Sequence, residues 1–255
     1  MEKILEVKHL KKIFKSGKEF KNVLNDINFT LNAGECLGVV GQSGCGKSTL
    51  AKIISRLLNA DEGEVILCGK NITRAEGQDL KSAYSEMQMI FQMPEESVNP
   101  RKTLGWSIGE PLRNHNFENV DERIETLLRE VGLTAEFINR YPHEVSGGQC
   151  QRAAIARAIS LSPKLLICDE ATSALDVTVQ AQIIKLLRKL CTEKKIAMLF
   201  ITHDLALLPK IADKVMVMHG GKIVEEGTPT EVIENSKSSF TKDLMATDFF
   251  TMAKI

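Results

Sequence analysis

The feature that most constrains the fold of this chain is a run of nine residues, Gly41-Gln42-Ser43-Gly44-Cys45-Gly46-Lys47-Ser48-Thr49. The short apolar run 36–40 before it predicts a buried strand, and apolar residues recur at helical spacing over 50–58 after it. Glycine has no Cβ, so the backbone can wrap closely around a ligand. Strand, glycine-rich turn and helix in this order predict a phosphate-binding loop, or P-loop.

Several residue types in this loop suit a bound phosphate. The free N–H groups and the dipole of the following helix favour an anion at the helix start. Lys47 can reach the β- and γ-phosphates of a nucleoside triphosphate, and the Ser48 hydroxyl can bind Mg²⁺. A chance glycine turn is the alternative, which the flanking strand and helix disfavour. Cys45 lies inside the loop, so we expect its alkylation to block nucleotide binding.

Composition limits the classes of function. A chain of 255 residues suits one large α/β domain with a subdomain. Lys plus Arg and Asp plus Glu both number 33, which gives no support for extensive nucleic-acid binding. No apolar run reaches the roughly 18 residues that span a bilayer, and the charged N-terminus is no signal peptide. We therefore expect a cytoplasmic chain whose membrane role comes through a partner.

The cysteines favour a reducing compartment. None forms a C-x-x-C pair or lies at zinc-ligand spacing from a histidine. Reduced thiols are the expected state. The six are Cys36, Cys45, Cys68, Cys150, Cys168 and Cys191.

A second motif is an apolar run, 165–168, that ends in Asp169 and Glu170. Ligands of parallel sheets bind at the carboxyl ends of strands, so this pair is expected to face the P-loop. Asp169 would hold Mg²⁺, and Glu170 would polarise the water that attacks the γ-phosphate. A solvated acidic pair at the start of a helix is the alternative.

A third motif, Ser146-Gly147-Gly148-Gln149, begins a predicted helix. Two glycines and a serine at a helix N-terminus form a second anion-binding surface. The chain cannot easily fold this surface onto its own P-loop, because both already cap helices. Taken alone, the tetrapeptide is better explained as a plain N-cap.

These motifs, in this order, resemble the ATP-binding subunits of ABC transporters. Residues 41–49 match Walker A, 165–170 match Walker B and 146–149 match the signature motif, which Cys150-Gln151-Arg152 follows as the family's glutamine–arginine pair would. Gln92 matches the Q-loop, Asp176 the D-loop and His203 the switch histidine; without the resemblance, a lone histidine after a strand is more often structural. The resemblance covers nearly the whole chain.

The resemblance implies a head-to-tail dimer that sandwiches two ATP molecules, each between one chain's Walker A and the other's signature motif. Ser146 and Gly148 would then serve the partner's ATP, whereas Glu170 and His203, with Gln92, would act catalytically on the ATP at Lys47. Mg²⁺ would be held by Ser48, Gln92 and Asp169. The residues implied to bind ATP are Phe14, Gly41, Ser43, Gly44, Cys45, Gly46, Lys47, Ser48, Thr49, Ser146, Gly147, Gly148, Gln149 and Asp176. Phe14 takes the place of the family's usual adenine-stacking tyrosine, with Phe20 as its rival.

The implied fold is α/β: a P-loop NTPase (RecA-like) parallel sheet core with an antiparallel β subdomain and an inserted helical subdomain. Within one ABC ATPase domain, 1–255, residues 1–92 and 163–230 form the nucleotide-binding core, 93–162 the helical subdomain with the signature motif, and 231–255 a short C-terminal tail. Periodicity predicts helices over 120–131, 149–160 and 179–190. Strands are predicted over 3–9, 23–31, 64–67, 165–168, 196–201 and 215–218, with a turn at 15–18.

Finer similarity is to the oligopeptide and nickel importer group, through residues 97–103, 141–144 and 172–182; Met93-Pro94-Glu95-Glu96 departs slightly from the group. The group pairs two different ATPase subunits with two permeases and an extracytoplasmic binding protein, so we expect a heterodimer at the cytoplasmic face of the membrane. The chain lacks the cysteine-bearing C-terminal extension of peptide importers, which favours the shorter nickel or metal–metallophore branch.

Residues from Gln92 to about Leu112, including Trp106, are expected to meet the permease. A place for Trp106 in the subdomain core is the equal alternative.

A soluble ABC ATPase of DNA repair or translation is a rival function. It is disfavoured because the chain shows no second ATPase domain, zinc-binding cysteines or long coiled-coil insert. A P-loop kinase is disfavoured by the signature motif, the D-loop and the switch histidine.

Overall fold

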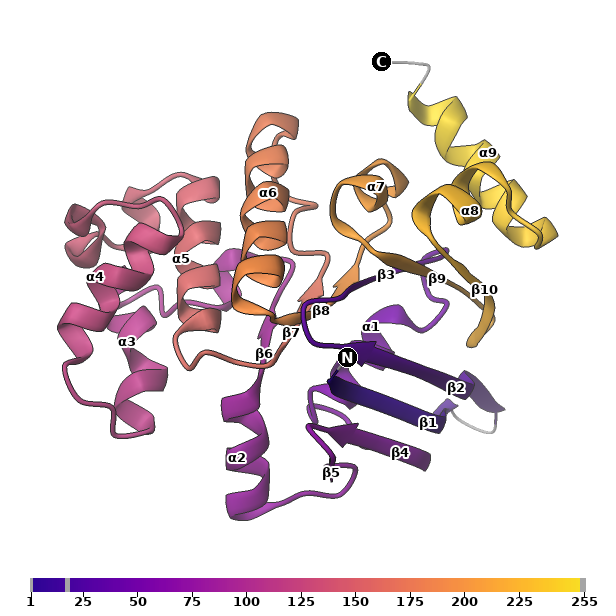
Figure 1. The fold of residues 1–255 in the computed structure, drawn as a ribbon, viewed down its shortest axis with the longest axis horizontal. Helices are drawn as coiled ribbons and strands as arrows, with labels where there is room; N and C mark the ends of the chain where they lie inside the picture. The colour runs from indigo at the N-terminus through magenta and orange to yellow at the C-terminus, as the bar shows by residue number, and fades with distance from the viewer. Residues whose placement is uncertain (1, 17–18, 253–255) are drawn as a thin grey trace.

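The computed structural model describes residues 2–16 and 19–252, which form two sheets packed on one another through α1 (Lys47–Ile54) (Figure 1). The larger sheet has the strand order β10–β9–β3–β8–β7–β6. Its strands are β3 (Cys36–Val40), β6 (Met87–Ile90), β7 (Leu165–Asp169), β8 (Ala197–Ile201), β9 (Lys214–His219) and β10 (Lys222–Gly227). All neighbours pair in parallel except β9 and β10, which confirms the predicted α/β class.

Burial explains why these strands are nearly continuous apolar runs. Every residue of β3 and of β8 is buried, because helices or the second sheet cover both faces. The edge strand β10 instead alternates exposed and half-buried residues, and its sequence carries lysine and glutamates. Its weak apolar pattern is the reason that it was not predicted.

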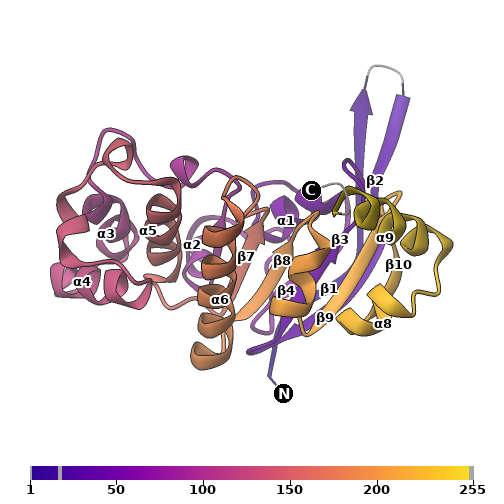
Figure 2. The ribbon, with the colours of Figure 1, turned by 90° about the horizontal axis from the view of Figure 1, so that it is seen from above.

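The second sheet is antiparallel, with the order β2–β1–β4–β5. Its strands are β1 (Lys3–Ser16), β2 (Glu19–Asn32), β4 (Glu62–Leu67) and β5 (Lys70–Asn71). The β1–β2 hairpin projects beyond the body of the molecule (Figure 2) and is longer than the predicted strands over 3–9 and 23–31. Lys15 lies in β1 rather than in a turn, and residues 17 and 18 of the predicted turn lie outside the described residues.

Three helices, α3 (Leu104–Asn114), α4 (Val120–Glu130) and α5 (Gly147–Ile159), form an arm at one end of the molecule (Figures 1 and 2). The predicted helix over 120–131 is thus confirmed, and Gly132, at φ 76°, follows its C-cap. The helix predicted over 149–160 begins two residues earlier, where Ser146 caps it. The helix predicted over 179–190 is longer, α6 (Val177–Lys194), because Asp176 is its N-cap.

Other elements had little apolar periodicity to predict them. In α2 (Gly77–Glu86) Ala83 is the one buried residue. The remaining α-helices are α7 (Leu208–Ile211), α8 (Pro229–Glu234) and α9 (Ser239–Met252); short 3₁₀ helices cover Pro94–Glu96, Ala135–Asn139, Pro142–Glu144 and Leu205–Leu207. Of the C-terminal segment, Val232 and Met245 are buried against β3 and β9.

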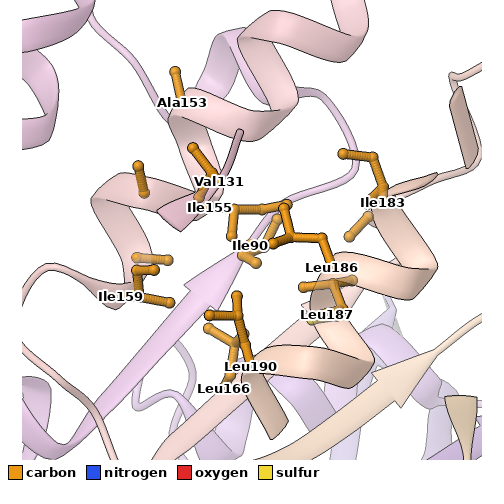
Figure 3. Close-up of a cluster of buried hydrophobic side chains, with 14 of the residues drawn as sticks. Ile90, Val131, Ala153, Ile155, Ile159, Leu166, Ile183, Leu186, Leu187 and Leu190 are labelled. Carbon is orange, nitrogen blue, oxygen red and sulfur yellow. The ribbon is translucent and has the colours of Figure 1, made fainter. Parts of the chain in front are cut away.

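The core continues from the arm into the sheet. Residues of α5, α6, β6 and β7 share one cluster of buried side chains (Figure 3), including Ile90, Ile155, Ile159, Leu166, Ile183 and Leu187. This shared core packs α5, which begins at the predicted signature residues, against β7, which leads to the predicted carboxylates. Within the described part of the chain, no helix combines the length and hydropathy needed to cross a bilayer.

Candidate nucleotide-binding and hydrolysis site

The P-loop joins β3 to α1 in a conformation that requires glycine. Gly41 has φ 149° and Gly46 has φ 113°. An added Cβ would lie 2.2 Å from the Met218 carbonyl oxygen at the first position and 2.6 Å from the Val23 carbonyl oxygen at the second. Gly46 is also the N-cap of α1 and offers no side-chain cap, so the first N–H groups of the helix remain available to a ligand.

Lys47 is buried, with 6% of its surface exposed. Its ammonium donates to the carbonyl oxygens of Gly41 at 2.7 Å and Gln42 at 3.2 Å. No carboxylate of the described residues forms an ion pair with it. A buried cation is costly without a counter-charge, so this position favours an anion.

The P-loop borders a cavity of ≈ 330 Å³ whose lining includes eight of the predicted residues. Its lining is Val23, Ser43, Gly44, Gly46, Lys47, Ser48, Thr49, Glu170 and His203. Val23 was not predicted; it belongs to β2, and no chemical motif marks it. A larger hollow of ≈ 790 Å³ beside β4, β5 and α2 contains none of the predicted residues, so we assign the site by its chemistry rather than by size.

Asp169 ends β7 and faces the P-loop, as predicted. The Ser48 hydroxyl donates to its Oδ1 at 3.1 Å, across 121 positions of sequence. Burial raises the pKa of the Asp169 carboxyl, and the neighbouring Glu170 adds to this, while the Ser48 bond opposes it. The hydroxyl and carboxylate oxygens form a donor set of the kind that Mg²⁺ prefers.

Glu170 follows in the left-handed conformation, at φ 52°. Its N–H donates to the Ile201 carbonyl oxygen at 3.0 Å, and its own carbonyl oxygen accepts from the N–H and hydroxyl of Ser173 at 3.1 and 3.0 Å. Its Oε2 lies 3.5 Å from Nδ1 of His203. The structure therefore brings together the two residues predicted to act on the γ-phosphate.

The signature residues do not line this cavity. Ser146 and Gln149 close the start of α5 with a capping box. The Ser146 hydroxyl accepts from the Gln149 N–H at 3.3 Å, and the Gln149 Oε1 accepts from the Ser146 N–H at 2.9 Å. Ser146 and Gly147 are exposed, and Gly148 is half-buried against Val179.

Three more predicted residues also lie outside the cavity lining. Gln92 is exposed, two residues after β6, at the sheet edge where β7 ends. Asp176 is exposed and caps α6 by accepting from the Val179 N–H at 3.0 Å. Phe14 is 40% exposed on the projecting hairpin, with the Lys12 ammonium 5.4 Å from its ring centre.

Cys45 is buried, with 7% of its surface exposed, and its Sγ lies 4.0 Å from the Lys47 ammonium. A group attached to this sulfur would lie beside the lysine. The effect of alkylation on nucleotide binding therefore stays a prediction with a geometric reason behind it.

Trp106 lies at the surface of the arm, 36% exposed, rather than in its core. The Lys102 ammonium lies 5.5 Å and the Arg113 guanidinium 5.4 Å from its ring centre. Arg113 also donates to the Trp106 carbonyl oxygen. The surface alternative is the one that this geometry favours.

Comparison with known proteins agrees with the motifs. The family model "ABC transporter" matches residues 24–173. The oligopeptide transport ATP-binding protein OppF of Haemophilus influenzae is 44% identical over 96% of this chain and 78% of its own length. OppF of Escherichia coli is 45% identical over 95% of this chain and 77% of its own length. The glutathione import ATP-binding protein GsiA of Pectobacterium atrosepticum is 44% identical over 88% of this chain, within 37% of its own length.

A solved structure gives the same answer for the fold. The dimeric post-hydrolysis state of the ATP-binding cassette MJ0796, bound to ADP and Pi, superposes with a TM-score of 0.80 at 28% identity, covering 89% of this chain and 99% of that one. The relatives named above are transport proteins, so the alternative of a DNA-repair or translation ATPase is not favoured. This chain belongs to the ABC transporter family, as one of its ATP-binding subunits.

Proposed function

We propose that this subunit hydrolyses ATP in the P-loop cavity and thereby powers the import of oligopeptides. The observation that carries the proposal is the meeting of Lys47, Ser48, Glu170 and His203 around one cavity, with Asp169 hydrogen-bonded to Ser48. The oligopeptide names of the two OppF relatives support this cargo over the nickel branch. Nickel and metal–metallophore cargo stay as the alternative outcome of the experiment below.

In this proposal each residue acts where the fold places it. Lys47 and the N–H groups of α1 bind the phosphates, since both lie at the cavity wall. Glu170 accepts a hydrogen bond from the attacking water and polarises it. His203, within 3.5 Å of Glu170, orients that carboxylate or bonds the γ-phosphate.

Ser48, Asp169 and Gln92 are the residues that would hold Mg²⁺. The ion would supply positive charge to the β- and γ-phosphate oxygens. The hydroxyl and carboxylate already in contact fit this use, and Gln92 lies at the same edge of the sheet.

The signature residues Ser146–Gln149 and the D-loop Asp176 serve the ATP of a partner ATPase subunit, facing this one head to tail. Their exposure, and their place outside this chain's own cavity, support that assignment. The partner is a second, different ABC ATPase, and Phe14 stacks on the adenine. The division into a core, 1–92 and 163–230, a helical subdomain, 93–162, and a tail, 231–255, is part of the same proposal.

Two permeases bind this dimer at the cytoplasmic face of the membrane, and a binding protein delivers cargo from the other side. The segment from Gln92 to Leu112 meets the permease, and exposed Trp106 is its anchor. Replacement of Trp106 by Ala is expected to reduce transport while ATP hydrolysis by the isolated chain stays at the wild-type rate. Equal loss of both activities would contradict this role.

The first experiment is to purify the tagged chain from mild-detergent extracts of its native membranes and to identify the accompanying proteins by mass spectrometry. Two permeases, a related ATPase and a binding protein are expected. The binding protein is then titrated with peptides, nickel and nickel–chelate complexes, and peptide binding is expected. Recovery of only soluble partners, ribosomes or DNA-repair proteins would overturn the transport proposal.

A further inference from the structure

A buried glutamine lies on the helix that carries the signature residues. Gln151 belongs to α5, five positions after Ser146, and its surface is entirely buried. The other inward residues of α5, such as Ile155 and Ile159, are apolar and fill the cluster against α6 and β7 (Figure 3). A polar amide in such surroundings is retained only where a hydrogen bond compensates its burial.

That hydrogen bond goes to the loop that holds the proposed catalytic carboxylate. Gln151 Nε2 donates to the carbonyl oxygen of Ala171 at 2.6 Å. Its Oε1 has no hydrogen-bond partner among the described residues. The amide must present nitrogen to this carbonyl, because a flipped amide would set oxygen against oxygen. The bond to Ala171 is therefore the contact that accounts for a polar residue here.

Ala171 immediately follows Glu170, whose left-handed backbone needs support. An L-residue other than glycine holds φ 52° only where its surroundings over-determine it. The core supplies one support, through the Ile201 carbonyl oxygen of β8, and the loop itself supplies another, through Ser173. The bond from Gln151 is the support that comes from α5.

Gln151 is not what joins α5 to its neighbours. Arg152 already ties α5 to the end of α4 through the Val131 carbonyl oxygen at 2.6 Å and to α6 through Gln182 Oε1 at 2.9 Å. Gly148 packs directly against Val179 of α6. With these contacts in place, the Gln151 bond acts on the loop rather than on the packing of helices.

We infer that Gln151 is a positioning residue for ATP hydrolysis: its bond to the Ala171 carbonyl holds the Glu170 backbone in the conformation that directs the carboxylate into the cavity. The same bond connects Glu170 to the helix that begins at the signature residues. The inference rests on the proposed role of Glu170 as the group that polarises water.

The test is Gln151→Met, which keeps the length of the side chain and removes the N–H donor. Steady-state hydrolysis by the full chain is expected to lose about 10-fold in kcat, with KM for ATP changed by less than about 2-fold, because the phosphate-binding residues are untouched. Gln182→Met is the matched control: it removes an exposed α5–α6 contact that does not touch the loop, and hydrolysis is expected to stay at the wild-type rate.

Gln151→Glu adds a second measurement, the pH dependence of hydrolysis, which a simple loss of packing would not change. A carboxyl at this position can donate to Ala171 only when protonated, and burial raises its pKa. The activity of Gln151→Glu, divided by that of the wild type at the same pH, is therefore expected to rise as pH falls. The same ratio for Gln151→Met is expected to stay constant.

Wild-type kcat in Gln151→Met would overturn the inference, as would a loss that only follows the fraction of protein still folded, measured by thermal melting. Glu170→Gln distinguishes a failure of the role proposed for Glu170 from a failure of the role inferred for Gln151. If that variant keeps near-normal turnover, the proposed role of Glu170 fails. If it is inactive while Gln151→Met is normal, only the present inference fails.

Discussion

Two helices of this protein begin at glycine-rich turns, and the two turns differ in what they offer a ligand. The start of α1 is open: its N-cap is Gly46, without a side-chain cap, beside the buried ammonium of Lys47. The start of α5 is closed by the reciprocal bonds of Ser146 and Gln149. Glycine at a helix start is therefore not enough to identify the site of this chain's own nucleotide.

The surroundings of the two turns differ as well. The open turn faces Glu170 across one cavity and contacts Asp169 through Ser48, so the residues proposed for binding and hydrolysis meet there. The closed turn is exposed and lies outside that cavity. The contrast supports a division in which the first turn acts on this chain's own nucleotide and the second presents a surface to another chain.

The largest expected effect comes from the carboxylates that face the open turn, Asp169 and Glu170. Glu170→Gln is expected to lower the rate of phosphate release by about 10²–10⁴-fold, the range that a general base contributes. ATP binding and ATP-dependent dimerisation should remain, because Lys47 is unchanged; fluorescent-nucleotide binding and size-exclusion chromatography measure them. Glu234→Gln, a surface change outside the cavity, is the control, and similar losses in both variants would contradict the assignment.

Lys47→Met comes next. Loss of a charge-assisted hydrogen bond to phosphate is expected to weaken ATP binding by about 10–150-fold, corresponding to about 1.5–3 kcal/mol. Ser146→Ala, at the closed turn, is expected to leave the affinity of the isolated chain unchanged. Equal weakening in a nucleotide titration of both variants would remove the distinction between the two turns.

Gly148→Ala tests why the closed turn contains glycine. An added Cβ would lie 2.5 Å from Val179 Cγ1, so overpacking is expected to lower the free energy of unfolding by about 1–2 kcal/mol after the gain in helix propensity. Gly148→Ala with Val179→Ala should recover part of the loss in a double-mutant cycle by urea denaturation. Gly147→Ala, whose Cβ would have 3.9 Å to its nearest neighbour, is the matched control.

The smallest effect concerns the cap itself. Ser146→Ala is expected to lower the free energy of unfolding by about 1 kcal/mol, because the Gln149 N–H loses its acceptor. Ser146→Asn should retain most of the stability, since asparagine is also a good N-cap. No difference between the two variants in urea denaturation would show that the capping box contributes little.

Local patterns were sufficient for much of the fold. The P-loop was predictable because strand, glycine turn and helix are contiguous, and the helix over 120–131 because its apolar residues share one face. The helices α2, α8 and α9 and the strand β10 were not predicted. Each buries few side chains or packs at the edge of the molecule, so its sequence shows little apolar periodicity.

The site divides in the same way. The identities of Lys47, Ser48, Asp169, Glu170 and His203 followed from motifs. The structure brings four of them around one cavity and joins Asp169 to it through the hydrogen bond from Ser48. Val23 could not be predicted as part of that cavity, because an apolar residue of a β-strand carries no chemical signal. Nor could the surface position of Trp106, which depends on how α3 packs in the arm.

The sequence by itself determined which groups this protein offers for the proposed phosphate binding and water polarisation, because those groups lie in short contiguous motifs. Only the tertiary structure decided which of them meet. Ser48 reaches Asp169 across 121 positions because β3 and β7 flank β8 in the parallel part of one sheet. Gln151 reaches the loop after Glu170 because α5 packs on the same core as β7. Such contacts depend on sheet order and helix packing, which no local pattern encodes.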